Sequence, residues 1–345
     1  MKINACQTLF RSTAIVFAMI AWMGCVGCHV LSPDHISARQ QFIAPELVND
    51  SSNQLEFGKP HKVLDTAGWI WGIPGKILLW DHRVDNHHIT APTVEAVADY
   101  LQANNLPHVK VRVNQYAPID DFHRLRKNKT VAWPYRYTLG LLSVGGETIL
   151  PGRFFGGDHF NPFTQTVHLY SDIPAVALHE LAHAKDFTRR KYQGTYALAY
   201  AFIPTWHETI ASRDVMAHLY DRRDRSGIIE ANRVLYPAYG TYVAGTASWF
   251  IPNGGSALYY GCVIAGHING RMLSRDIDQH LADYHQTFRS RPVSTPAAIV
   301  PHQLPGVPVP SSLPMQDGPA SVEPSELTAP SLSQREPENA QVLTR

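Results

Sequence analysis

Two histidines four residues apart, His179 and His183, lie in the stretch "AVALHELAHAKDF", residues 175–187, with Glu180 directly after the first. In a helix, side chains four residues apart project from the same face, so the two imidazoles would lie side by side. Two imidazole nitrogens presented in this way can bind one Zn²⁺. The Glu180 side chain points about 100° further round the helix, within reach of a water at the metal. The spacing therefore predicts two metal ligands and a general base on one rigid element.

A zinc site that performs catalysis needs a third protein ligand and an open position. Glu208 is our candidate, because it lies in a second helical stretch, "TWHETIASRDVMAHLY", far enough after His183 for the chain to turn and return. A histidine or a carboxylate would serve. The rival third ligands in the same stretch are Asp214, His207 and His218.

The pattern resembles that of the gluzincin class of zinc metallopeptidases, in which a His-Glu-x-x-His motif is followed by a glutamate on a following helix. The resemblance implies that His179, His183 and Glu208 hold Zn²⁺ and that Glu180 is the catalytic residue that moves protons during peptide-bond hydrolysis. The class often has an aspartate four residues after the ligand glutamate, where this chain has Ser212.

The resemblance covers residues 166–220 and implies a zincin-like α+β fold. In such a fold a small mixed sheet packs on the motif helix, and a mainly helical C-terminal part follows. The run Thr166–Tyr170 would be the edge strand along which an extended peptide binds. An oxyanion-stabilising residue is usual in this class, and the candidates here are Tyr236, Tyr239, Tyr242 and His267.

The elements that must position these side chains can be predicted from hydrophobic periodicity. Residues 90–106 carry apolar side chains at helical spacing, and residues 108–116 alternate valines with polar neighbours, as a half-buried strand does. Residues 146–172 contain two strand-like runs around the turn-rich "GGDHFNPF". Residues 68–80, "GWIWGIPGKILLW", are predicted to be an apolar strand or turn on the core, with the protein surface or a membrane contact as the alternative.

Beyond the strand-like runs the pattern is helical, and we expect helices over 175–189, 205–224 and 227–235. Two apolar pieces follow, 238–250 and 257–268, each too short to cross a membrane. Small residues recur four apart in both pieces and allow helices to approach closely. A buried helical hairpin is therefore favoured over a re-entrant membrane element.

The N-terminal 28 residues have a positively charged head, an apolar run over 14–23 and a close of small residues, as a secretory signal peptide does. The last three, Val-Gly-Cys, resemble the end of a bacterial lipobox, which predicts a lipid anchor at Cys28, with Cys25 as the competing site. This places the chain in a bacterial cell envelope, outside the cytoplasm and attached to the membrane. Plain secretion and an uncleaved anchor are the alternatives.

The chain thus divides into four predicted segments. They are a signal peptide over 1–28, a polar tether over 29–60, a zincin-like metallopeptidase domain over 61–286 and a disordered, proline-rich tail over 287–345. The hydrophobic content of 44% and charged content of 17% exclude a chain that is disordered throughout. A formal net charge of +1 gives no general attraction for nucleic acid.

Together these patterns predict a lipid-anchored zinc peptidase whose partners are peptide or protein substrates and the membrane, with no nucleic acid. Two alternatives use the same residues differently. The site could hold zinc without cleaving peptides, or the chain could be an envelope lipoprotein that holds no metal and interacts with partners through its proline-rich tail.

Overall fold

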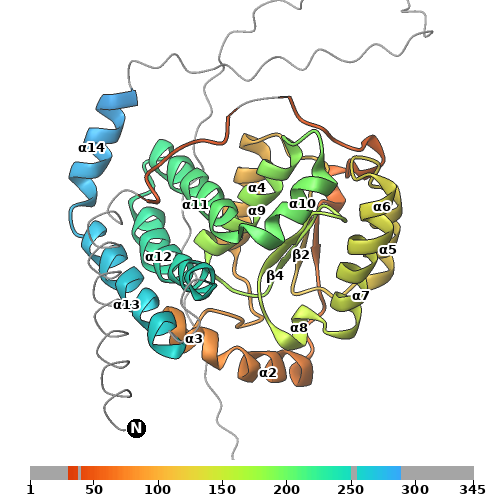
Figure 1. Ribbon diagram of the computed structural model, residues 1–345, viewed down its shortest axis with the longest axis horizontal. Coiled ribbons are helices and arrows are strands. Elements are labelled where there is room, and N and C mark those ends of the chain that lie inside the picture. Colours follow the sequence, from red (N-terminus) through yellow and green to blue (C-terminus); the bar gives the residue numbers. More distant parts are fainter. Residues whose placement is uncertain (1–29, 38–39, 250–254, 289–345) are drawn as a thin grey trace, which may run out of the picture. The chain divides into compact units, whose positions relative to one another are not determined.

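The computed structural model describes residues 30–37, 40–249 and 255–288 (Figure 1). This part of the chain is α+β and mostly helical, with a mixed four-stranded sheet, which confirms the predicted fold class at that level. The predicted signal peptide, both lipobox cysteines and all but the first two residues of the predicted tail lie outside the described residues. Among the described residues, no helix combines the length and the apolar character needed to cross a membrane.

The sheet has the strand order β1-β2-β4-β3. Strands β1 (Leu55–Phe57), β2 (Lys110–Val113) and β4 (Thr166–Leu169) run parallel, whereas β3 (His159–Asn161) pairs antiparallel with β4. The predicted strand over 108–116 is thus present as β2. Because β4 has a partner on each side, its backbone groups are used within the sheet, and β3 is the edge beside it.

The predicted edge strand over 166–170 is therefore an interior strand, and the edge strand lies within "GGDHFNPF", for which the sequence predicts a turn. A strand of three residues is too short to show alternation in sequence. The strand-like run predicted before it, over 146–155, is instead the end of helix α7 (Leu141–Ile149) and helix α8 (Gly152–Phe155). Apolar runs of this length do not distinguish a strand from a helix.

The segment expected to be a polar tether, 29–60, contributes to the folded body. Its residues 55–57 form β1, with Leu55 opposite Val111 of β2. Leu31 is buried in the main core, with 1% of its surface exposed. Isolated apolar side chains in a polar stretch give little periodic signal, so this packing could not be predicted from composition. Two short turns of 3-10 helix precede the strand, Pro45–Leu47 and Ser51–Asn53.

The apolar stretch 68–80 is helical and superficial. It forms the end of α2 (Lys62–Trp71) and all of α3 (Ile73–Leu79), and Trp71 and Ile77 are exposed. The predicted helix over 90–106 is α4 (Ala91–Ala103). The sheet lies between α4 and α9 on one side and a group of helices on the other (Figure 1). This second group consists of α5 (Pro118–Lys127), α6 (Trp133–Tyr135), a π-helical turn (Arg136–Gly140) and α7.

The helices after the sheet are α9 (Pro174–Thr188), α10 (Gln193–Phe202), α11 (Pro204–Asp221), α12 (Arg225–Ser248), α13 (Gly255–Leu273) and α14 (Ile277–Phe288). Helices α12 and α13 form the predicted hairpin. A Cβ added at Gly240 or at Gly266 would lie 2.5 Å from a carbonyl oxygen of the facing helix, so these glycines permit the close approach. The hairpin is only partly buried, because Ile264 and Ile268 are about half exposed.

The two faces of the sheet differ in chemistry. On one face, Val167 and Leu169 of β4 pack with Leu178 and Leu181 of α9 in the main hydrophobic core. On the other face, His168 of β4 points toward α5 and α7 and lies among charged side chains. Alternation along the strand places these residues on opposite sides. The histidine motif on α9 thus packs against the apolar face.

Candidate metal centre

Helix α9 is held at its N-terminal end by a carboxylate from another helix. The Ala175 backbone N–H donates to Glu230 Oε2 of α12 at 3.1 Å, and Arg83 Nη1 donates to Glu230 Oε1 at 2.8 Å. The first N–H groups of a helix have no partner within it, and the helix dipole favours a negative charge there. The motif helix therefore has a fixed start, beginning at Pro174 with the proline in its first turn.

Three of the predicted residues meet in the interior, between α9 and α11. His179 Nε2 lies 2.8 Å from Glu208 Oε2 and 3.0 Å from His183 Nε2, and His183 Nε2 lies 3.4 Å from Glu208 Oε1. All three side chains are buried. Ligands bound tetrahedrally at about 2.0–2.1 Å stand about 3.3 Å apart, close to these separations. The group, here called the helix-built cluster, could hold a metal ion.

Two hydroxyl groups contact the cluster. Tyr200 of α10 donates to Glu208 Oε1 at 2.5 Å and lies 3.5 Å from His183 Nε2. Ser212 Oγ lies 3.3 Å from His179 Nδ1, so serine contacts the imidazole from the position where the gluzincin pattern often has aspartate. Tyr200 was not among the predicted residues. Its sequence signal is weak: a second tyrosine, Tyr196, stands four residues before it on the same helix.

The charges of the cluster shift the titration of its members. Burial raises the pKa of Glu208, but the positive charge of His183 and hydrogen bonds from both histidines outweigh it, and the pKa falls well below its usual value. Burial lowers the pKa of His183, and the charge and hydrogen bond of Glu208 more than reverse this effect. The carboxylate of Glu208 is therefore ionised at neutral pH, as a metal ligand must be.

Glu180 projects to the side of the pair and is half-buried. Burial raises its pKa, the histidines of the motif lower it, and the charge of Glu208 raises it, with a net upward shift. A carboxyl group whose pKa is raised is a stronger base than an ordinary surface carboxylate. Glu180 is thus a carboxyl group with a raised pKa next to His179 in the chain.

Asp214, a rival third ligand, is bound elsewhere. Its carboxylate accepts from Lys185 Nζ at 2.6 and 2.9 Å, from the Ile36 N–H at 2.7 Å and from the Tyr100 hydroxyl. Both Lys185 and Asp214 are buried. This ion pair joins α9 to α11 and so fixes the two helices that carry the cluster.

The other rivals also lie outside the cluster. His218 Nε2 pairs with Asp99 at 3.4 Å. His207 is buried among aromatic rings, with Tyr196 and Tyr200 centroids 4.5 Å away, and neither of its ring nitrogens has a hydrogen-bond partner among the described residues. Glu208 is therefore the one member of the four candidates that the structure brings to the histidine pair.

The four candidates for an oxyanion donor differ in their surroundings. Burial, the charges of Glu208 and Glu180 and a side-chain hydrogen bond with Glu208 all raise the pKa of Tyr242. Tyr239 accepts a hydrogen bond from Thr209 at 3.0 Å, and Tyr236 is buried. His267 lies away from the cluster, with its Nε2 2.8 Å from the Leu78 carbonyl. Tyr242 is thus the best placed of the four.

No protein-family model, curated protein or solved structure matches this chain.

Proposed function

We propose that this chain is a zinc-dependent peptidase, most simply an endopeptidase, with the helix-built cluster as its metal site and Glu180 as its catalytic base. The observation that carries the proposal is the convergence of two imidazole nitrogens and one carboxylate at separations of 2.8, 3.0 and 3.4 Å, beside a carboxyl group with a raised pKa. The three ligands come from two rigid helices, and two histidines with one glutamate is a donor set typical of catalytic zinc.

The donor atoms fit Zn²⁺ in charge as well as in spacing. A histidine that ligates through Nε2 usually donates its Nδ1–H to a neighbouring oxygen, and Ser212 Oγ is within reach of His179 Nδ1 at 3.3 Å. One negative charge from Glu208 and two neutral imidazoles leave the bound ion with a net positive charge. Such an ion polarises a carbonyl group and lowers the pKa of water to about 7.

The protein's own residues then carry the protons and hold the substrate. Glu180 takes a proton from the attacking water at its carboxylate and delivers it to the nitrogen of the departing amine, so the base is regenerated in each turnover. Tyr200 keeps the Glu208 carboxylate oriented through its 2.5 Å hydrogen bond. We assign Tyr242 to the developing negative charge on the carbonyl oxygen, because its side chain forms a hydrogen bond with Glu208 and a phenol hydroxyl is a hydrogen-bond donor.

The edge strand supports an extended peptide as the substrate. Strand β3 pairs with β4 and, among the described residues, with no other strand, so its outer backbone groups can pair with a peptide. Phe160 of β3 contacts Phe187 of α9, with ring centroids 5.6 Å apart, so the edge lies alongside the motif helix. This placement supports the proposed zincin-like arrangement of sheet, helix and substrate.

The N-terminal sequence pattern supports a location of the proposed peptidase in a bacterial cell envelope. A lipid on Cys28, or on Cys25, would hold it at a membrane surface outside the cytoplasm, and envelope proteins or peptides would be its substrates. Radiolabelled palmitate incorporated by the wild-type chain and lost in Cys28→Ala would support this assignment, and unchanged labelling of the double variant Cys25→Ala/Cys28→Ala would contradict it.

The decisive test compares the wild-type chain with Glu180→Gln, which keeps the shape and removes the base. We expect both proteins to retain zinc, and the variant to hydrolyse casein or a peptide library about 10²- to 10⁴-fold more slowly. Glu95→Gln, at an exposed position of α4, is the matched control and should cleave like the wild type. Equal cleavage by the wild type and Glu180→Gln would remove Glu180 from the mechanism, and zinc without cleavage in the wild type would favour a non-catalytic metal protein.

A further inference from the structure

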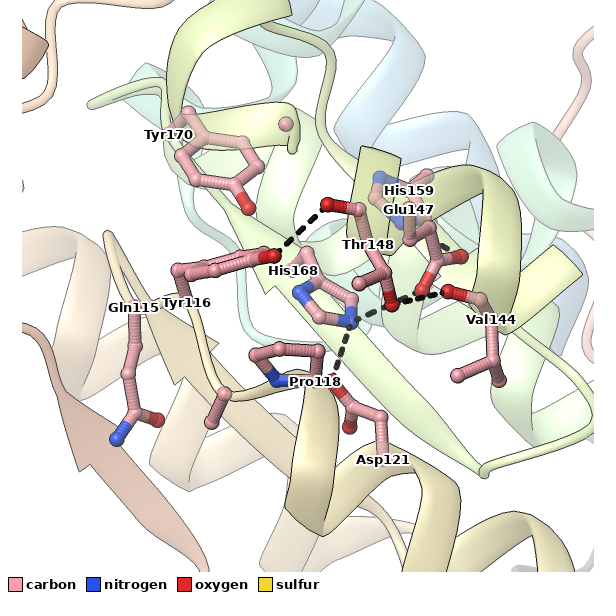
Figure 2. A pocket seen from close by; sticks show the side chains of 12 residues that line it. Gln115, Tyr116, Pro118, Asp121, Val144, Glu147, Thr148, His159, His168 and Tyr170 are labelled. Carbon is pink, nitrogen blue, oxygen red and sulfur yellow. Dashed lines mark hydrogen bonds and ion pairs between the residues drawn. The ribbon is translucent and has the colours of Figure 1, made fainter. Parts of the chain in front are cut away.

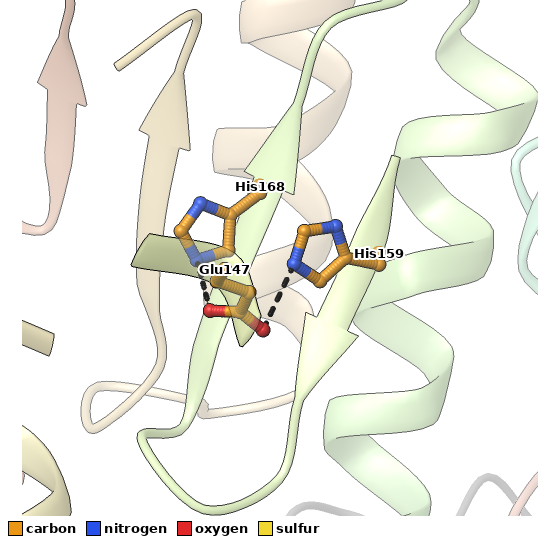
Figure 3. A group of neighbouring side chains, drawn as sticks. All are labelled: Glu147, His159 and His168. Carbon is orange, nitrogen blue, oxygen red and sulfur yellow. Dashed lines mark ion pairs between the residues drawn. The ribbon is translucent and has the colours of Figure 1, made fainter. Parts of the chain in front are cut away.

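A second group of metal-ligating side chains lies on the opposite face of the sheet. Glu147 of α7, His159 of β3 and His168 of β4 place one ligand atom each within 4.8 Å of one another (Figure 3). We call this group the strand-built cluster. It shares no residue with the helix-built cluster, and the proposed peptidase mechanism does not use it.

Strand pairing brings the two histidines together. His159 of β3 is directly opposite His168 of β4 in the antiparallel register, and their rings stack with centroids 4.7 Å apart and planes 9° apart. Side chains opposite each other on such strands have Cβ atoms about 4.5–5.5 Å apart, close enough to chelate one ion. Both rings present Nε2 toward α7, where Glu147 closes the group (Figure 3).

The glutamate is held in place by its neighbours. Glu147 Oε1 accepts from Asn161 Nδ2 at 2.7 Å and lies 3.2 Å from His159 Nε2, while Oε2 lies 3.9 Å from His168 Nε2. Asn161 is two residues after His159 on β3 and so shares its face of the sheet. The carboxylate is thus fixed between the two imidazoles before any ion binds.

Three buried atoms of this cluster make no well-formed hydrogen bond among the described residues, and they are His159 Nε2, His168 Nε2 and Glu147 Oε2. The contact of His159 Nε2 with Glu147 Oε1 at 3.2 Å is an ion pair when the imidazole is protonated. A buried polar atom without a partner is unfavourable, because it has lost its hydrogen bonds to water and gained none in the protein. A proton on one imidazole can complete only one contact and leaves the other atoms unpaired. A single divalent cation can satisfy all three at once, because imidazole nitrogen and carboxylate oxygen are both ligands for it.

The second imidazole nitrogen of His159 supports this arrangement. His159 Nδ1 lies 3.0 Å from the Gly157 carbonyl oxygen, which can only accept, so Nδ1 carries the proton. In the neutral ring the lone pair is then on Nε2, directed at the cluster. Histidine ligands of metals are commonly oriented by such a hydrogen bond on their other nitrogen.

The cluster borders a small cavity on the side of α5 (Figure 2). Its volume is about 10 Å³, room for roughly one water molecule. Asp121 lines the cavity, with Oδ2 4.0 Å from His168 Nε2 and Oδ1 accepting from the buried Arg112. The surroundings therefore offer negative charge near a cation and space for a further ligand.

We propose that Glu147, His159 and His168 form a second divalent-cation site, of the two-histidine, one-carboxylate type that Zn²⁺ favours. The ion links α7 to β3 and β4 and so fixes the edge strand of the sheet. Its ligands are not those of the proposed peptidase and lie on the far face of the sheet from the α9 core contacts, so zinc binding at the two clusters can be measured separately.

The test counts zinc bound by the full chain after removal of metal and dialysis against Zn²⁺. We expect about two zinc ions per wild-type chain, and a loss of about one in each double variant, His159→Asn/His168→Asn and His179→Asn/His183→Asn. His88→Asn, which alters an exposed histidine outside both clusters, is the control and should keep the wild-type count. An unchanged count in His159→Asn/His168→Asn would overturn the proposal.

Two further measurements guard against variants that fail to fold. The wild-type chain loaded with ¹¹³Cd²⁺ should give two NMR resonances with nitrogen- and oxygen-type shifts, and one resonance would contradict the second site. Glu147→Gln is isosteric and should weaken one of the two zinc-binding steps at least about tenfold. Unchanged binding there would also count against the proposal. Loss of zinc in the strand-built variants alone would leave this site standing and remove the metal from the proposed peptidase.

Discussion

The two clusters use the same donor set and are built in opposite ways. In the helix-built cluster, two histidines four residues apart are aligned by one helix, and a buried ion pair holds the third ligand's helix against it. In the strand-built cluster, the histidines are nine positions apart and meet only through strand register. The first is specified mainly by local geometry, and the second depends on the sheet being assembled.

This difference explains what could be predicted from sequence. The four-residue spacing of His179 and His183 predicts a shared face whatever the rest of the chain does, and Glu208 followed because a third ligand had to lie on a later helix. No spacing rule relates Glu147 to His159 and His168, because register across an antiparallel pair depends on where the turn falls. The helix-built cluster was therefore visible in sequence, and the strand-built cluster was not.

The largest effect should come from breaking the ion pair between α9 and α11. Lys185→Met leaves the buried Asp214 carboxylate without its cation, and we expect the free energy of unfolding to fall by about 3–5 kcal/mol. Glu147→Gln, in the partly exposed strand-built cluster, should cost about 1 kcal/mol or less without metal. Urea unfolding of the metal-free proteins measures both. Equal losses of unfolding free energy in the two variants would mean that both regions depend equally on buried charge for stability.

Tyr200→Phe tests whether the hydrogen bond from Tyr200 to Glu208 stabilises the helix-built cluster. The variant removes the hydrogen bond to Glu208 and keeps the ring, so zinc affinity at this cluster should fall by about 2 kcal/mol, roughly thirtyfold. Zinc competition with a chromophoric chelator gives the affinity. Binding at the strand-built cluster, which Tyr200 does not contact, serves as the internal reference, and a parallel loss at both sites would indicate a general change of structure.

Acid sensitivity should arise in part from a histidine outside both clusters. Burial, and then the charge of Arg124, lowers the pKa of His108 to about 3. The unfolded chain takes up this proton near pH 6.5, whereas the folded protein excludes it, so stability is unaffected above pH 6.5 and falls as the pH drops toward 3. At pH 5.5 the loss should be about 1.4 kcal/mol.

His108→Gln should reduce that loss, since glutamine does not titrate. Unfolding free energies of wild type and variant at pH 7.5 and pH 5.5 provide the comparison. If both proteins lose the same stability between these pH values, the acid sensitivity belongs to other groups.

Ser212→Ala should have the smallest effect. The 3.3 Å contact between Ser212 Oγ and His179 Nδ1 is long and neutral, so its removal should weaken zinc binding by about 1 kcal/mol, roughly fivefold. The zinc affinity of the strand-built cluster should not change. A loss greater than a hundredfold would show that serine does more than orient the ring.

The sequence predicts the long elements well, because apolar residues repeat at regular spacing over many positions. It predicts the short elements less well, because they contain too few residues for a repeat. The α+β class, the helix over 90–106 and the hairpin of α12 and α13 follow from repeated apolar spacing. Strand β3 has three residues, and the apolar run before it is equally compatible with a strand and a helix. Tyr200 was missed because its contact with Glu208 depends on how α10 turns back across α9.

The burial of Leu31 limits how far the folded body could move from the proposed lipid anchor at the membrane. Leu31 is the third residue after Cys28, and an extended chain spans at most about 3.6 Å per residue, so a lipid on Cys28 would keep the folded body within about 11 Å of the anchor. A long flexible tether would let an enzyme sample the space far from the bilayer. This chain would instead stay close to the membrane surface, and its substrates would have to present their cleavable segments there.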